Sequence, residues 1–230
     1  MLAFTALLLA GSIGSSMVTL PAGSWRPLYG RNGDAPVKVA SFQLDRDPVT
    51  RGAFLAFART NPQWRASAPE AGSAADLRRP VTSVSWHAAN AYCTAQGKRL
   101  PTTAEWEYAA AASRTKRDAA RDPEFVQQLV TLYASRPRTL PAVGRGAPNA
   151  YGVRGLHDLG WEWVSDFPNA PQVHEHHAAA RARGEHDLYC ASAAIGALDP
   201  ANYAAFLRFA VRGALTPTSS MATLGFRCAA

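Results

Sequence analysis

The stretch KRLPTTAEWEY, residues 98–108, decides how the chain around it folds. Pro101 keeps the residue before it extended, so a helix cannot begin any earlier. Thr102 and, three residues later, Glu105 form a capping box, in which the hydroxyl and the carboxylate each accept a hydrogen bond from a backbone N–H at the helix start. The stretch therefore predicts an extended segment, a proline turn and a helix that runs to about Ser113.

Strand signals lie upstream of this stretch, and loop signals surround it. Residues 17–25 read as a strand that leads into a turn, and residues 37–44 alternate by two as a strand does. Residues 62–80 contain several prolines and a glycine, which predicts a loop. Residues 114–148 stay ambiguous between a charged loop and a short helix around residues 125–132.

Helix signals occur at several other places. Thr50 is typical of a helix cap, and Phe54 and Phe57 share one face of the helix that would follow it. Residues 86–96 predict a second helix, which Gly97 ends.

A further helix is predicted near the end of the chain, followed by a final strand. Asp199 would cap this helix, and Pro200 would take its favoured first position. Helices and short strands separated by long loops are not a βαβ alternation, so the pattern indicates an α+β fold.

Length and composition are those of one folded domain. The 230 residues, of which 47% are apolar and 18% charged, can bury a sizeable core, which excludes global disorder. The 17 glycines and 16 prolines favour a loop-rich architecture. The net charge of +7 comes with no aromatic-plus-basic stripe, zinc finger or helix-turn-helix pattern, so we expect no nucleic-acid partner.

The first residues resemble a secretory leader. Residues 2–14 are apolar, too short for a membrane span, and run into small residues such as those near a signal-peptidase site. We expect a leader over residues 1–16, a domain over residues 17–230, and a periplasmic or secreted protein without a membrane span. A positive segment before the apolar run is missing, which leaves open a true start at Met17.

Five groups of motifs resemble the formylglycine-generating enzyme family, also called sulfatase-modifying factors. They occur in family order along the chain: PVT at 48–50, VSW at 84–86 with AYC at 91–93, RLPTTAEWEY at 99–108, NAYG at 149–152 with WEWV at 161–164, and LGFR at 224–227. The resemblance implies a C-type-lectin-like α+β fold with little regular secondary structure. It also implies a disulfide between Cys93 and Cys228.

The resemblance gives the scaffold but not the family's chemistry. Formylglycine-generating enzymes oxidise a target cysteine with a pair of cysteines that bind Cu(I), and the ungapped match places Asp199 and Ala204 at those positions. Neither side chain replaces a thiolate. The family's calcium-binding turn corresponds to residues 158–160, where Leu159 removes an oxygen ligand, although Glu162 remains a calcium candidate.

The third cysteine offers an alternative metal site. Cys190 follows His174, His176 and His177, and imidazole with thiolate suits copper or zinc. Cys190 is therefore also the candidate catalytic residue. The alternative is a solvated loop with a buried or modified cysteine.

A ligand cleft is the last candidate site. By the resemblance, Arg208 and Arg212 lie near the place where the family's cleft opens. They could bind an anionic group or a peptide backbone, or could instead be surface residues or form buried ion pairs. Trp86 matches an aromatic family position, in the core or facing the cleft, and His157 could line a pocket or make a structural hydrogen bond. Glu107 looks like an internal ion-pair partner.

These features together predict an exported accessory or binding protein that acts on a protein or peptide partner. Local motifs, among them PLY at 27–29 and DPANYAAF at 199–206, are similar to a subgroup found beside copper nitrite reductases, which suggests a link to that enzyme. One alternative is a diverged copper oxidase that uses Cys190. Another is a lectin-like ligand-binding module, for which calcium would be the cofactor.

Overall fold

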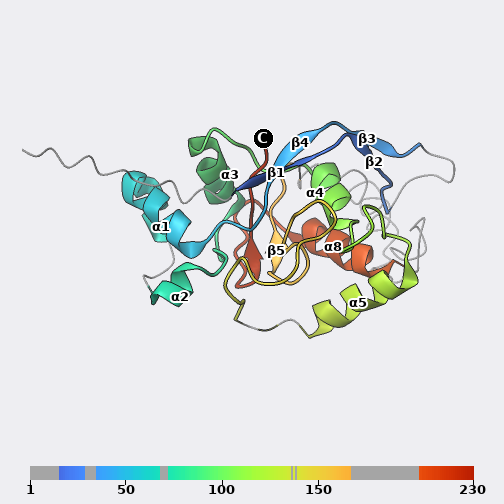
Figure 1. Ribbon diagram of the computed structural model, residues 1–230. Coiled ribbons are helices and arrows are strands. Elements are labelled where there is room, and N and C mark those ends of the chain that lie inside the picture. Colours follow the sequence, from blue (N-terminus) through green and yellow to red (C-terminus); the bar gives the residue numbers. More distant parts are fainter. Residues whose placement is uncertain (1–15, 29–34, 68–71, 136, 138, 167–201) are drawn as a thin grey trace, which may run out of the picture.

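The computed structural model describes residues 16–28, 35–67, 72–135, 137, 139–166 and 202–230. Short strands and helices alternate with long loops (Figure 1). The strands are β1 (Met17–Leu20), β2 (Gly23–Trp25), β3 (Val37–Val39), β4 (Phe42–Asp45), β5 (Trp161–Glu162) and β6 (Leu224–Gly225). The helices are α1 (Arg51–Thr60), the 3-10 helix η1 (Pro62–Ser67), α2 (Ala74–Leu77), α3 (Trp86–Ala95), α4 (Thr103–Ala110), α5 (Pro123–Ala134) and α8 (Tyr203–Ala214). The predicted α+β fold with little regular secondary structure is confirmed.

The strands form three separate pairs. β1 pairs with β4 and β2 with β3, both antiparallel, whereas β5 and β6 are parallel. The single strand predicted over residues 37–44 is therefore wrong, because the chain changes partner between β3 and β4. Ser41 lies at this change, and its hydroxyl donates to the carbonyl of Leu20 at 2.9 Å.

The capping box of α4 is present as predicted. The Thr102 hydroxyl accepts from the Glu105 N–H at 3.2 Å, and the Glu105 carboxylate accepts from the Thr102 N–H at 2.8 Å. Arg99 holds the same carboxylate with two contacts of 2.6 and 2.7 Å. The extended residues before Pro101 and the helix after it are thus joined through one carboxylate.

α4 ends at Ala110, before the predicted Ser113. The carbonyl of Ala109 accepts from the Asn149 side chain at 2.8 Å, and the carbonyl of Ala110 accepts from His157 at 2.9 Å. Side chains from a distant loop thus bond the last carbonyls, and the chain leaves the helix. This contact is tertiary, so no local signal predicts it.

The other helices follow their predicted caps with one correction, at the start of α8. The caps of α1 and α3 are confirmed, with Thr50 accepting from the Ala53 N–H at 3.1 Å and Gly97 at φ +67° after α3. α8 begins later than predicted, because Asn202 is its cap and accepts from the Ala205 N–H at 3.0 Å. Asp199 and Pro200 lie outside the described residues.

The loop predicted over residues 62–80 is also corrected. It contains η1 and α2, and α2 has a capping box of its own, formed by Ser73 and Asp76. Among the described helices, α5 and α8 are the longest at 12 residues each, and none is long and apolar enough to cross a lipid bilayer.

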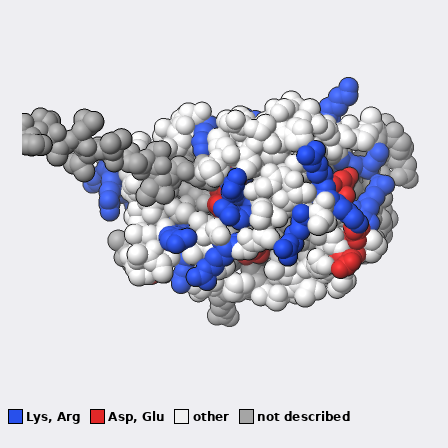
Figure 2. All heavy atoms as spheres, in the orientation of Figure 1, with Lys and Arg blue, Asp and Glu red and all other residues white. Residues whose placement is uncertain are grey.

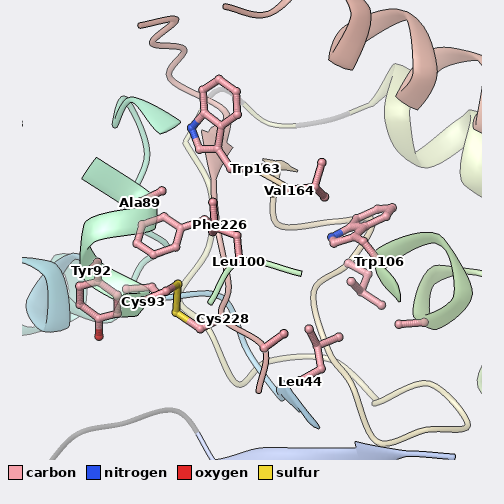
Figure 3. Close-up of a cluster of buried hydrophobic side chains, with 14 of the residues drawn as sticks. Leu44, Ala89, Tyr92, Cys93, Leu100, Trp106, Trp163, Val164, Phe226 and Cys228 are labelled. Atoms are coloured by element: carbon pink, nitrogen blue, oxygen red, sulfur yellow. A yellow bond between two sulfur atoms is a disulfide. The ribbon is translucent and has the colours of Figure 1, made fainter. Parts of the chain in front are cut away.

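The core lies where α1, α3, β4 and the last residues of the chain meet (Figure 3). The Tyr92 ring packs against Phe54 and Phe226, with centroid distances of 6.0 and 5.4 Å. Beside it a disulfide joins Cys93 to Cys228, with a Cα–Cα distance of 5.6 Å. Both cysteines are fully buried.

The last residues form an inner strand-like segment between β4 and residue 99. The Asp45 N–H donates to the Cys228 carbonyl at 2.9 Å, and Arg99 and Ala229 exchange two hydrogen bonds. On the face that Figure 2 shows, Lys and Arg side chains lie at several separate places and do not form one continuous basic stripe.

Replacing both Cys93 and Cys228 with alanine is expected to lower the free energy of unfolding by about 5 kcal/mol, because the disulfide closes a loop of 135 residues. Denaturant unfolding of wild type and variant measures the difference. Thr94→Ala, at an exposed position of the same helix, is the control and should stay within about 0.5 kcal/mol. A loss below about 1 kcal/mol in the double variant would contradict the entropic role given to the disulfide.

Candidate functional site

Glu107 on α4 lies between two arginines of α8. Arg208 donates to its carboxylate through Nε at 3.0 Å and Nη2 at 2.8 Å, and Arg212 donates through Nη1. All three residues are buried, with at most 9% of each exposed. Arg208 and Arg212 are one turn apart, so both reach the same carboxylate.

Glu107 and Arg208 each stabilise the ionised form of the other. Burial alone would raise the pKa of Glu107, but Arg208 and Arg212 outweigh it and lower that pKa to about 2. Burial would likewise lower the pKa of Arg208, but Glu107 raises it above its usual range. The cluster therefore remains ionised from neutral pH down to strongly acidic pH.

A hydrogen-bonded chain runs from this cluster to the end of α4. Arg208 donates to the Tyr133 hydroxyl at 3.1 Å, and that hydroxyl lies 2.8 Å from Nδ1 of His157. Nε2 of His157 lies 2.9 Å from the carbonyl of Ala110. Because a carbonyl only accepts, Nε2 carries the proton and Nδ1 accepts from Tyr133. Each hydrogen-bonding group in the chain thus has a partner.

Trp106 joins this cluster to a second buried ion pair. Its ring faces the guanidinium groups of Arg212 and Arg208, at 4.8 and 5.8 Å from the ring centroid. Its indole N–H donates to Glu162 at 2.7 Å. Figure 3 shows Trp106 directed into the core beside Val164.

The second ion pair is formed by Glu162 and Arg227, and Arg227 has no exposed surface. Two guanidinium nitrogens of Arg227 donate to the Glu162 carboxylate at 2.8 and 2.9 Å. The other donations go to the carbonyls of Asp45, Arg46 and Arg154, at 3.0, 3.2 and 2.8 Å. The five donors of the guanidinium are thereby matched by five bonds.

The structure gives Glu162 and Leu159 interior positions. The Glu162 carboxylate faces Arg227 and Trp106, and the Leu159 side chain is 4% exposed. Glu162 therefore serves as the counter-ion of Arg227 in the interior. Within the described part of the chain, no group of three or more His, Cys, Asp or Glu side chains is arranged to hold a metal ion.

The space beside Arg208 and Arg212 is very small. A cavity of about 10 Å³ lies among these arginines, Trp106 and Trp161, which is about the room one water needs. The two arginines are buried ion-pair residues, which is one of the alternatives that the sequence leaves open, and they do not line an open cleft among the described residues. His157 is held between Tyr133 and Ala110 in the same interior.

The remaining candidates are separate from this cluster. Trp86, at the start of α3, is half-buried, and its indole N–H donates to the carbonyl of Val164 at 2.9 Å. The proposed copper set, His174, His176, His177 and Cys190, lies outside the described residues.

Two features, half-buried Tyr133 and buried Asp45, have no counterpart in the sequence analysis. Tyr133 lies in α5, in the region that stayed ambiguous. Asp45, which is 2% exposed, forms an ion pair of 2.7 Å with Lys98. Asp45 ends an alternating strand, but the partner is more than fifty residues away, so only the fold brings the two together.

Comparison with known families gives a match over nearly the whole chain. The family model described as "Sulfatase-modifying factor enzyme 1-like domain" matches residues 11–230. A formylglycine-generating enzyme of Thermomonospora curvata is 29% identical, with 95% of this chain and 94% of that protein covered. The enzyme of that name from Streptomyces coelicolor is 33% identical, with 72% of this chain but only 57% of that protein covered.

Two further relatives extend the comparison. A Bos taurus protein named "Inactive C-alpha-formylglycine-generating enzyme 2" is 28% identical over 93% of this chain and 87% of its own length. The solved structure of PvdO from Pseudomonas aeruginosa matches with a TM-score of 0.54, at 19% identity and over 93% of each chain. This structural likeness concerns the fold alone.

Glu107→Gln is expected to lower the free energy of unfolding at neutral pH by about 3–5 kcal/mol, because it leaves two buried arginines without their counter-ion. The pKa of Glu107 is about 2 in the folded protein against 4.5 unfolded, so its stabilisation is complete above pH 4.5 and is lost as the pH falls towards 2. Urea unfolding should therefore show the difference between wild type and variant narrowing below pH 4.5.

The control for this comparison is Glu124→Gln on α5, where the side chain is exposed. Its unfolding free energy should stay within about 0.5 kcal/mol of wild type throughout. A difference between wild type and Glu107→Gln that does not change with pH would show that the charge of Glu107 is not what stabilises the cluster.

Proposed function

This chain belongs to the family of sulfatase-modifying factor enzyme 1-like domains, and from that premise we propose that it is a non-catalytic member. In this proposal the protein binds a protein or peptide partner and does not form formylglycine. The partner is a polypeptide, because the family's enzymes act on a cysteine of one.

The observation that carries the proposal is the residue at position 204. By the ungapped match, Ala204 takes the place of one cysteine of the Cu(I)-binding pair, and the other place is taken by Asp199. The Ala204 side chain is fully buried in the first turn of α8. A methyl group offers Cu(I) no ligand, and a carboxylate is a poor one.

The surroundings of α8 support the same conclusion. Arg208 and Arg212 are both paired with the carboxylate of Glu107, and the space beside them is about 10 Å³. The Bos taurus relative whose name calls it inactive indicates that the fold is also used without catalysis.

Export and a copper enzyme as partner are the finer parts of the proposal. The buried disulfide and the expected leader over residues 1–16 both favour an oxidising compartment such as the periplasm. The motifs at 27–29 and 199–206 favour a link to a copper nitrite reductase, as in the subgroup they are similar to.

Two alternative functions remain, and a specific observation bears on each. Because Cys93 and Cys228 pair, Cys190 is the one cysteine of the three outside that disulfide, and with His174, His176 and His177 it could bind copper in a diverged oxidase. A calcium-dependent lectin-like module is the weaker alternative. Its candidate calcium ligand, the Glu162 carboxylate, is already paired with Arg227.

Incubation with Cu(I), oxygen and a cysteine peptide that the Streptomyces coelicolor enzyme converts is expected to leave the peptide unmodified. Mass spectrometry detects formylglycine as a loss of sulfur, and that enzyme serves as the positive control. Metal analysis of wild type and Cys190→Ser should show no stoichiometric copper in either. Peptide conversion, or copper that Cys190→Ser loses, would establish the oxidase instead.

The partner is tested by a direct binding measurement. Purified copper nitrite reductase from the same organism is expected to bind the immobilised protein with a dissociation constant in the micromolar range or tighter, as transient partners do. Bovine serum albumin serves as the negative control. If neither the reduced nor the oxidised reductase binds, the proposed partner is wrong. The proposal that the protein is non-catalytic would not be affected by that result.

A further inference from the structure

A larger cavity lies away from the cluster around Glu107. It has a volume of about 150 Å³ and is lined by the end of β4, the cap of α1, the last turn of α3 and the loop at residue 143. We call it the Lys98–Tyr92 cavity, after two of the lining side chains that carry hydrogen-bond donors. Ser16 and Gln96, which also line it, are exposed. A cavity of this volume takes a molecule of about the size of benzene.

The carboxylates that line this cavity are already paired. Asp45 accepts from Lys98 at 2.7 Å and from the Cys228 N–H at 3.0 Å. Asp47 accepts from Arg154 at 2.8 and 3.1 Å. Each negative charge therefore has a positive partner, and the lining as a whole is close to neutral. A further charge brought into it would stay without a counter-ion, which is costly away from water.

The hydrogen-bond donors of Lys98 and Tyr92, by contrast, are not all bonded to described residues. An ammonium has three donors, and among the described residues that of Lys98 has one acceptor, Asp45. The Tyr92 hydroxyl makes no hydrogen bond to the described residues, although Tyr92 is only 7% exposed. Burial, together with the nearby Asp45, raises the pKa of Tyr92 to about 12, so the hydroxyl keeps its proton at neutral pH.

The remaining lining is mixed, with four apolar residues, Pro48, Val49, Ala53 and Val143, beside the uncharged polar residues Ser16, Thr50 and Gln96. The Thr50 hydroxyl already accepts from the Ala53 N–H at the start of α1. A ligand that fits should therefore combine one strong hydrogen-bond acceptor with a compact apolar body and no net charge.

The geometry points to the Lys98–Tyr92 cavity as a binding site for a small neutral molecule that carries a carbonyl oxygen, such as a carboxamide. The carbonyl oxygen has two lone pairs and accepts from Lys98 and from Tyr92. The apolar part of the molecule packs on Pro48 and Val49. This site is distinct from the cluster around Glu107 and does not depend on the function proposed above.

The probe is benzamide, compared with benzoate, benzylamine and toluene, which share its ring. Calorimetric titration of the full chain should give a millimolar or tighter dissociation constant for benzamide, at least about tenfold weaker binding of the two charged probes, and the weakest binding for toluene. Amide chemical shifts of residues 96–98 should move with benzamide. Stronger binding of benzoate or benzylamine, or no binding of benzamide, would overturn the proposal.

Tyr92→Phe is the decisive variant, because it removes the hydroxyl and keeps the ring that packs on Phe54 and Phe226. Its thermal stability should match that of wild type, and its affinity for benzamide should fall about fivefold. Tyr203→Phe, where the side chain is 50% exposed on α8, is the control and should bind as wild type does. Equal affinity of Tyr92→Phe and wild type would sink the assignment of Tyr92 as a donor.

Discussion

The guanidinium of Arg227 is the constraint on which the rest of the structure depends. A buried arginine is tolerated only when all its donors are bonded, and this one finds its acceptors at Asp45, Arg46, Arg154 and Glu162. These acceptors lie at the end of β4 and just after it, in the loop before β5, and in β5 itself. Segments far apart in the chain are therefore fixed around a single side chain. The described strands form only two-stranded sheets, so strand pairing aligns few of these segments. The hydrogen bonds of Arg227 hold them together instead.

The second ion pair extends this arrangement to the helices. Trp106 contacts Glu162 through its indole N–H and the two arginines of α8 through its ring, so α4, α8 and β5 share one buried side chain. The buried polar network therefore connects the helices to the strand that holds Glu162. In the non-catalytic role that we propose, this network would keep the shape of the partner-binding surface constant.

Local chemistry explains which parts of the structure were predictable. The caps at Thr50 and Thr102 and the glycine after α3 act through neighbouring residues, so the sequence alone places these helices. The end of α4 is set by Asn149 and His157, and the split of residues 37–44 is set by a change of strand partner, both of which are tertiary effects. At the site, Glu107 was recognisable as an ion-pair residue, but Tyr133 and the pairing of Asp45 with Lys98 depend on contacts across the fold.

The position of residues 228–230 beside β4 has a consequence for how the protein is made. β4 forms backbone hydrogen bonds with Cys228 and Ala230. Cys93 can form its disulfide only after Cys228, in the same segment, has been synthesised. The central contacts therefore join residues from opposite ends of the domain, which gives slow folding of high contact order. A chain emerging from the ribosome cannot close its core before residue 230 has been synthesised. Until then the chain lacks both the disulfide and the backbone hydrogen bonds that join its end to β4.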